Sequence, residues 1–187
     1  MNHSFRTSFG SVALRPLTRQ DALKLRALRN RNSKFFLTQQ QITEEQQLNW
    51  FQNYLLREND YMFAITLRDK PEEFCGAIGI YNLDKRDHTG ESGRVIIDKE
   101  LVLQKGIGTL AICAAYRFAF EQLGLRKVFA QILPENIASI RAHEKAGYVL
   151  SGKKDDCLLY EITAEHYTAA LKKEEATYEY SGVSGNL

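Results

Sequence analysis

The 187-residue sequence has little cysteine, little net charge and no long apolar run. Its three cysteines, Cys75, Cys113 and Cys157, are an odd number, lie far apart and form no C-x-x-C pair. We therefore expect reduced, buried thiols and neither a disulfide nor a metal site. A formal charge of +2, without a lysine- or arginine-rich block, argues against a nucleic-acid-binding protein.

Targeting and membrane-spanning segments are also missing. The N-terminus has no signal-peptide-like apolar stretch, and the most apolar helical segment, residues 111–120, is interrupted by Arg117 and too short to cross a bilayer. We expect a cytoplasmic protein without membrane contact. Because repeats and linkers are absent, we expect one domain over residues 1–173, frayed at residues 1–10, and a flexible tail over residues 174–187.

Two glycines lie where a predicted strand passes into a predicted helix. Residues 94–97 form a short apolar run rich in β-branched side chains, and apolar residues at helical spacing follow from Leu110. Between them, Gly106 and Gly108 permit φ > 0 and leave no Cβ, so successive N–H groups can face one anion at the positive end of the helix. The segment predicts a diphosphate-binding loop.

Three interpretations of this loop compete. The P-loop pattern G-x-x-x-x-G-K-[ST] is absent. Residues 106–111 fit the dinucleotide pattern G-x-G-x-x-A, but that pattern follows a first strand and precedes an acidic residue by about 20 positions. Here the loop lies beyond mid-chain, and the next predicted strand, residues 127–132, has no acidic residue. An ordinary strand–helix turn remains, and the surrounding residues decide among the three.

Downstream of the loop come Asn136-Ile137-Ala138-Ser139 and then His143-Glu144-Lys145-Ala146-Gly147-Tyr148. This order resembles the GCN5-related N-acetyltransferase (GNAT) superfamily, whose acetyl-CoA loop Q/R-x-x-G-x-G/A is followed by N-x-x-S, an aromatic residue and G-F/Y. The resemblance covers residues 12–162. Residues 91–100 look most like the branch of ribosomal-protein N-terminal, spermidine and aminosugar-nucleotide acetyltransferases.

The resemblance implies an α/β (α+β) fold, with a mixed, mostly antiparallel sheet of about seven strands, splayed at its centre and flanked by helices. It also implies acetyl-CoA as co-substrate, no metal, and a monomer or homodimer acting on a small-molecule amine. The loop departs from the pattern, because Leu103 stands at the Q/R position and Gln104 replaces a frequent glycine. The residues expected to bind the coenzyme are Val95, Ile96, Ile97, Gln104, Lys105, Gly106, Ile107, Gly108, Thr109, Asn136, Ser139 and Lys145.

Acetyl transfer to an amine needs a base for the ammonium and an acid for the leaving thiolate. Glu91 stands where this branch usually has a glutamate base; the alternative is a solvated carboxylate on a charged turn. The superfamily's usual acid is a tyrosine four residues before the glycine of G-F/Y, and here that position is His143, which either donates a proton or packs in the core. Ser139 is the alternative acid, or else a helix-start hydroxyl.

The acceptor is expected to bind on the side of the first two helices and the early strands. An arginine with aromatic rings suits a nucleotide-linked aminosugar, because a guanidinium binds diphosphate and a ring stacks on the base. A polyamine would need an acidic pocket, which Glu44, Glu45 and Glu58 are candidates to supply, and a protein N-terminus would need an open groove. A coenzyme A-binding protein without turnover is the alternative to an enzyme. The candidate acceptor-binding residues are Arg29, Asn30, Trp50, Tyr81 and Asn82.

Overall fold

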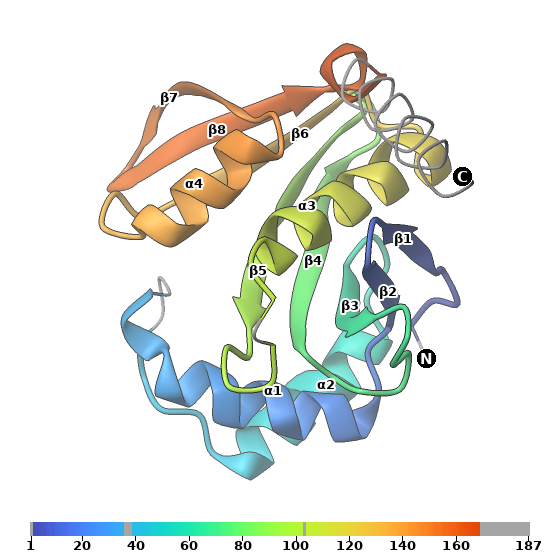
Figure 1. Cartoon of the computed structure of the whole chain (residues 1–187), viewed down its shortest axis with the longest axis vertical. Coiled ribbons are helices and arrows are strands. Elements are labelled where there is room, and N and C mark those ends of the chain that lie inside the picture. The colour runs from blue at the N-terminus through green and yellow to red at the C-terminus, as the bar shows by residue number, and fades with distance from the viewer. Residues whose placement is uncertain (1, 36–38, 103, 169–187) are drawn as a thin grey trace, which may run out of the picture.

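The computed structural model describes residues 2–35, 39–102 and 104–168. These residues form an eight-stranded sheet in the order β1-β2-β3-β4-β5-β6-β8-β7, antiparallel throughout except for the parallel pair β5 and β6 (Figure 1). The strands are β1 (Thr7–Phe9), β2 (Val12–Pro16), β3 (Tyr61–Leu67), β4 (Gly76–Asp84), β5 (Thr89–Ile97), β6 (Lys127–Ile132), β7 (Val149–Lys154) and β8 (Cys157–Thr163). The helices are α1 (Arg19–Arg31), the 3₁₀ turn η1 (Ser33–Phe35), α2 (Glu44–Leu55), α3 (Ile107–Arg117), its π-helical continuation η2 (Phe118–Gln122) and α4 (Ile137–Lys145).

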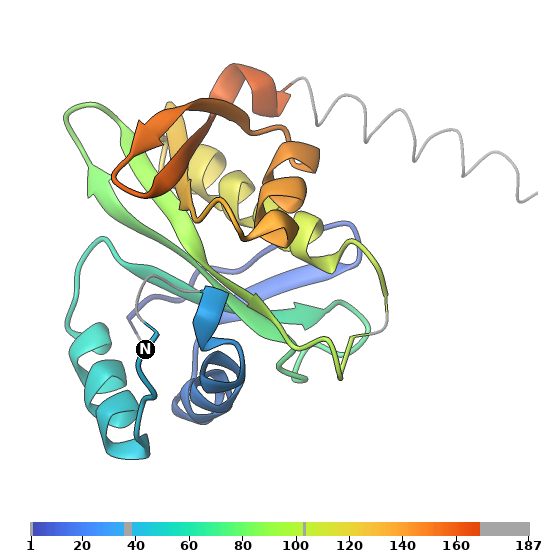
Figure 2. The same ribbon diagram turned by 90° about the vertical axis from the view of Figure 1, so that its left-hand side faces the viewer.

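Helices cover both faces of the sheet, α1 and α2 on one face and α3 and α4 on the other (Figure 2). Successive side chains of a strand point to opposite faces, so each inner strand contributes side chains to two hydrophobic cores, one on each face of the sheet. Along β3, Met62 and Ala64 are buried in the cluster that includes α1 and α2 side chains, whereas Phe63 and Ile65 are buried with those of α3. The predicted mixed, mostly antiparallel sheet is confirmed, with eight strands instead of about seven.

The sequence patterns Thr18-x-x-Asp21 and Thr43-x-x-Gln46 predict helix caps, and the first two helices begin at them. The Thr18 hydroxyl accepts from the Asp21 amide, and the Asp21 carboxylate accepts from the Thr18 amide. Thr43 and Gln46 form the same reciprocal capping box before α2. Asp21 is also buried in an ion pair with Arg15 of β2, at 2.6 Å between Nη1 and Oδ2. The start of α1 is therefore fixed to the sheet.

The other expectations about the termini, the cysteines and the membrane have different outcomes. Residues 7–9, expected to be frayed, form β1, because the turn at Gly10 (φ +55°) folds them back on β2 so that Thr7 pairs with Leu14. The three cysteines are buried free thiols, as predicted. The tail, residues 174–187, lies outside the described residues. Among the helices that the structure describes, none is long and apolar enough to cross a membrane.

Strand β5 is irregular on both of its edges. Toward β6 it pairs at three positions, the last being Glu91 with Phe129, after which the two strands diverge (Figure 1). Toward β4 the register changes between the pairs Ala77–Ile96 and Gly79–Gly93, so β5 carries one extra residue there. Arg94 lies in this bulge with φ +55°, a left-handed conformation that is unusual for a residue other than glycine. The splayed centre implied by the resemblance is confirmed.

The Arg15–Asp21 pair generates a stability prediction. Asp21→Asn leaves Arg15 as a buried charge without its carboxylate, so we expect a loss of about 3–5 kcal/mol in the free energy of unfolding at neutral pH, measured by urea denaturation. The matched control is Asp69→Asn at an exposed position, with an expected change within about 0.5 kcal/mol.

The same difference should depend on pH. Burial alone would raise the pKa of Asp21, but its hydrogen bonds with Arg15 and Thr18 outweigh burial and lower it. The stabilisation is therefore complete above the ordinary aspartate pKa of about 4 and is lost as the pH falls through the lower folded-state pKa. A gap between wild type and Asp21→Asn that widens as the solution is acidified would contradict this account.

Candidate active site

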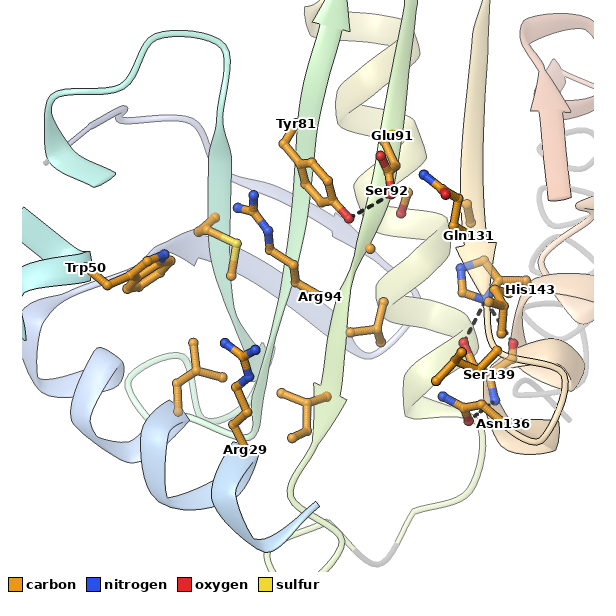
Figure 3. A pocket seen from close by; sticks show the side chains of 18 of the residues that line it. Arg29, Trp50, Tyr81, Glu91, Ser92, Arg94, Gln131, Asn136, Ser139 and His143 are labelled. Carbon is orange, nitrogen blue, oxygen red and sulfur yellow. Dashed lines mark hydrogen bonds between the residues drawn. The ribbon is translucent and has the colours of Figure 1, made fainter. Parts of the chain in front are cut away.

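Two cavities meet where β5 and β6 diverge. The first, of about 340 Å³, lies against α1, α2 and α4 and is called the α1-side cavity (Figure 3). The second, of about 610 Å³, lies against α3 and α4 and is called the α3-side cavity. Because the same four residues line both, the two spaces are joined at this point. The shared residues are Val95, Ile96, Asn136 and Ser139.

The α3-side cavity is built to hold an anion. Gly106, just before α3, has φ +89°, and a Cβ placed there would meet no atom within 4 Å, so its backbone faces open space. In the described chain no side chain caps α3, so the N–H groups of its first turn are available to a ligand. Every residue that the sequence predicts to bind coenzyme lines this cavity, and its basic lining residues are Lys99, Lys105, Arg141 and Lys145.

The departure at Gln104 has a structural role. Its Nε2 donates to the Ser11 hydroxyl at 3.3 Å and so ties the loop to the turn between β1 and β2. Leu103 lies outside the described residues. The altered loop therefore leaves the turn at Gly106 open toward the cavity.

Strand β5 offers free backbone groups to the same space. Beyond Glu91 no strand of the described chain pairs with the β6-facing edge of β5. Val95 and Ile96 of this stretch line both cavities, and Ile97 lines the α3-side cavity. An extended ligand can therefore add its own amides to this edge, in the way that a peptide adds to a sheet.

Glu91 is buried inside β5 and is not the solvated turn residue that the sequence left possible. It is 7% exposed and accepts hydrogen bonds from Tyr81 Oη at 3.0 Å and Asn82 Nδ2 at 2.9 Å. Burial and the neighbouring Glu91 raise the pKa of Tyr81, so its phenol stays protonated and donates. The carboxylate is held by two donors and lines the α1-side cavity.

The start of α4 brings three predicted residues together. Asn136 is the helix cap, with Oδ1 accepting from the Ser139 amide at 3.2 Å. His143 Nδ1 lies 2.8 Å from the Ser139 carbonyl oxygen and 3.4 Å from the Ser139 hydroxyl. The imidazole is 2% exposed, and burial lowers its pKa to about 4, opposed by the Ser139 carbonyl. At neutral pH the ring is therefore uncharged.

The predicted acceptor-binding residues separate into two groups. Arg29, Trp50 and Tyr81 line the α1-side cavity, with Arg29 reaching in from α1 and Trp50 lying on the α2 side (Figure 3). Asn82 contacts Glu91 instead of the cavity, and Asn30 is outside the lining. The Asn30 side chain bonds the amide and carbonyl of Ile42, which fixes the segment before α2.

The family model of the acetyltransferase (GNAT) domain matches residues 11–149. The chain is a GNAT acetyltransferase. It is therefore an acetyl-CoA-dependent N-acetyltransferase. The residues predicted to bind the coenzyme line one cavity of this GNAT protein.

Individual relatives of this GNAT protein agree with the family. "Probable N-acetyltransferase YjcK" of Bacillus subtilis (strain 168) is 26% identical over 152 residues, 76% of this chain and 82% of YjcK. FdhC, described as a nucleotide-linked sugar GNAT, superposes with a TM-score of 0.78 at 20% identity over 95% of this chain and 98% of FdhC. A Vibrio cholerae spermidine N-acetyltransferase bound to CoA and spermine superposes with a TM-score of 0.73 at 19% sequence identity. The superposition covers 84% of this chain and 98% of the Vibrio protein. At these identities the superpositions show a shared fold.

Sequence reasoning missed the most prominent side chain of the α1-side cavity. Arg94 projects into it from the β5 bulge, with Nη1 2.7 Å from Asp60 Oδ1 and its guanidinium 3.9 Å from the centre of the Tyr81 ring. The neighbouring Gly93 makes room for Tyr81, because a Cβ on Gly93 would come within 2.4 Å of the Tyr81 hydroxyl. In the sequence, a glycine inside the predicted strand at position 93 was the signal that another group packs closely against the backbone there.

Gly106 gives a test of the coenzyme cavity. In Gly106→Ala the new methyl group points into the open space before α3 and the residue must keep φ +89°, so we expect coenzyme A to bind at least about tenfold more weakly by calorimetry. Gly124→Ala is the control, because Gly124 also has positive φ and open space around it but lines neither cavity. Equal losses of affinity in both variants would show that backbone strain alone is responsible.

Proposed function

We propose that this GNAT protein acetylates the primary amine of an anionic acceptor, a nucleotide-linked aminosugar, by direct attack in a ternary complex. The observation that carries the proposal is the charge of the α1-side cavity. Two arginines, Arg29 of α1 and Arg94 of β5, reach into it, and Glu91 is the carboxylate among its described lining residues (Figure 3).

The two arginines lie close enough for the charge of one to affect the pKa of the other. Burial and the nearby Arg94 lower the pKa of Arg29, and a guanidinium in a protein keeps its charge. Arg94 is paired with Asp60, which also accepts from Arg57 at 3.2 Å. A diphosphate or carboxylate would gain charge-assisted hydrogen bonds from these guanidinium groups, whereas a polycation would be repelled.

Trp50 gives the cavity a flat apolar surface. Its indole is half-buried and stacks on Tyr54 at 5.5 Å between ring centres and 9° between planes, which holds it in one orientation. A nucleobase can stack on such a ring. The similarity to FdhC, a nucleotide-linked sugar GNAT, supports the same class of acceptor.

A polyamine acceptor has less support, although spermidine acetyltransferases share the fold. The carboxylates that would recognise it, Glu44, Glu45 and Glu58, are exposed and none of them lines the α1-side cavity.

The residues at the junction suit direct transfer. Acetyl-CoA supplies a thioester whose carbonyl carbon is attacked by the amine. Glu91, directly or through water, takes the ammonium proton before attack, and a backbone N–H of the β5 bulge polarises the carbonyl. As the carbon–sulfur bond breaks, the electron pair stays on sulfur and a proton is delivered from the α4 side, where Ser139 and His143 lie.

The acceptor class can be tested with an amine panel of a nucleotide-linked aminosugar, spermidine and a peptide N-terminus. We expect the aminosugar to be the preferred substrate. Arg94→Asn, which tolerates positive φ but removes the charge, should raise its KM roughly 10- to 100-fold, because a hydrogen bond to a charged group contributes about 1.5–3 kcal/mol.

Arg86→Asn, on an exposed turn, is the matched control and should leave KM unchanged. A preference for spermidine, or an Arg94→Asn enzyme with normal KM for the aminosugar, would refute the acceptor assignment. Coenzyme binding without turnover of any amine would identify a binding protein instead of an enzyme.

Glu91→Gln tests the base. The amide keeps the shape of the side chain and cannot take a proton, so kcat should fall roughly 10²- to 10⁴-fold while the Kd of coenzyme A stays the same. Glu58→Gln, an exposed residue, serves as the control. A Glu91→Gln enzyme with wild-type kcat would exclude Glu91 as the base.

A further inference from the structure

The hydrogen bonds of His143 determine which ring nitrogen carries the proton. A carbonyl oxygen only accepts, so the 2.8 Å contact with the Ser139 carbonyl requires a proton on Nδ1. Because the ring is neutral, Nε2 then has a lone pair and no proton. His143 therefore has no proton to donate from Nε2, and its Nδ1–H donates mainly to the Ser139 carbonyl oxygen.

Three buried polar atoms lie around this ring without a hydrogen-bond partner in the described part of the chain. They are His143 Nε2, the Tyr148 hydroxyl and the Ser92 hydroxyl, on residues that are 1–3% exposed. The Tyr148 ring meets the imidazole edge-on, with 5.0 Å between ring centres. Burial keeps the Tyr148 phenol protonated by raising its pKa, and the nearby Ser92 hydroxyl opposes that shift.

Hydrogen-bonding chemistry limits how these three atoms can be paired. Nε2 only accepts, whereas each hydroxyl both donates and accepts. The pairing that would satisfy all three atoms has the Tyr148 hydroxyl donating to Nε2 and accepting from Ser92, with an enclosed water as the bridge wherever no direct bond joins them. The result is a chain with a single direction, Ser92 to Tyr148 to His143 to Ser139. This chain would join β5, which carries Ser92, to α4, which carries Ser139; Figure 3 shows these two residues on their elements.

We propose that Ser92, Tyr148 and His143 form a buried hydrogen-bond chain that positions Ser139 as the proton donor to the leaving thiolate. The proposal rests on the proposed acetyl transfer and makes His143 a positioning residue that acts through Ser139, which lines both cavities. When the carbon–sulfur bond breaks, sulfur keeps the electron pair and takes the Ser139 proton. The Nδ1–H of His143, 3.4 Å from Ser139 Oγ, stabilises that oxygen until it regains a proton through cavity water from the attacking nitrogen, which gives up its second proton as the amide forms.

The protonation of His143 can be read without any enzymatic assay, by NMR of the ring nitrogens in protein with isotope-labelled histidine. We expect Nδ1 to be protonated and Nε2 bare at neutral pH, with the ring neutral until the pH approaches its pKa of about 4. His143→Gln assigns the signals. In Tyr148→Phe the Nε2 resonance should shift, because its donor is lost. A proton on Nε2, or a resonance unmoved by Tyr148→Phe, would overturn the chain whether or not the acceptor has been identified.

Kinetics then test the role of the chain. Ser139→Ala should lower kcat most, and Tyr148→Phe should lower kcat roughly five- to tenfold with unchanged KM for both substrates. His143→Gln, which keeps an acceptor, should retain more activity than His143→Phe. Tyr160→Phe removes another buried hydroxyl, one bonded to Glu144, and should leave kcat unchanged. Normal kcat in Ser139→Ala, or equal losses in Tyr148→Phe and Tyr160→Phe, would refute the positioning role.

Discussion

The parting of β5 from β6 after the Glu91–Phe129 pair is the constraint on which the site depends. Up to that pair the two strands share backbone hydrogen bonds, and beyond it each strand has an edge with unused groups. Buried backbone groups must find partners, so the opened edge is stable only where a ligand or water supplies them. Both cavities adjoin this opening, and Ser139 and Asn136 of α4 stand at their junction.

A second constraint comes from Tyr81, which joins Glu91, the proposed base, to the proposed acceptor side. Its hydroxyl holds Glu91, its ring lies under the Arg94 guanidinium, and its tip fills the space that a side chain on Gly93 would need. Asp60 fixes the other end of Arg94. A residue held at positive φ costs free energy that its surroundings must offset, and these contacts do so. Recognition of the acceptor and placement of Glu91 therefore depend on the same packed group.

The sequence predicted what local patterns encode. The caps at Thr18 and Thr43 and the glycine turn before α3 are matched by the structure, because each depends on short spacing and backbone chemistry. The residues predicted to bind the coenzyme all line one cavity, and their role stays a prediction. Contacts between distant segments were beyond it. The bulge at Arg94 and its Asp60 partner join residues 34 positions apart, and β1 depends on pairing across Gly10. Asn30 is predicted to bind the acceptor from its place on the first helix, whereas its side chain bonds Ile42.

We propose that coenzyme A occupies the opened edge of β5 and the turn before α3. Amide hydrogen exchange with and without coenzyme A measures this occupancy directly at each backbone position. We expect slower exchange on binding at alternate residues of Val95 to Ile97 and at Gly106 to Thr109, with little change in β7. Exchange rates at both segments that stay the same while the coenzyme is bound would contradict this mode of binding.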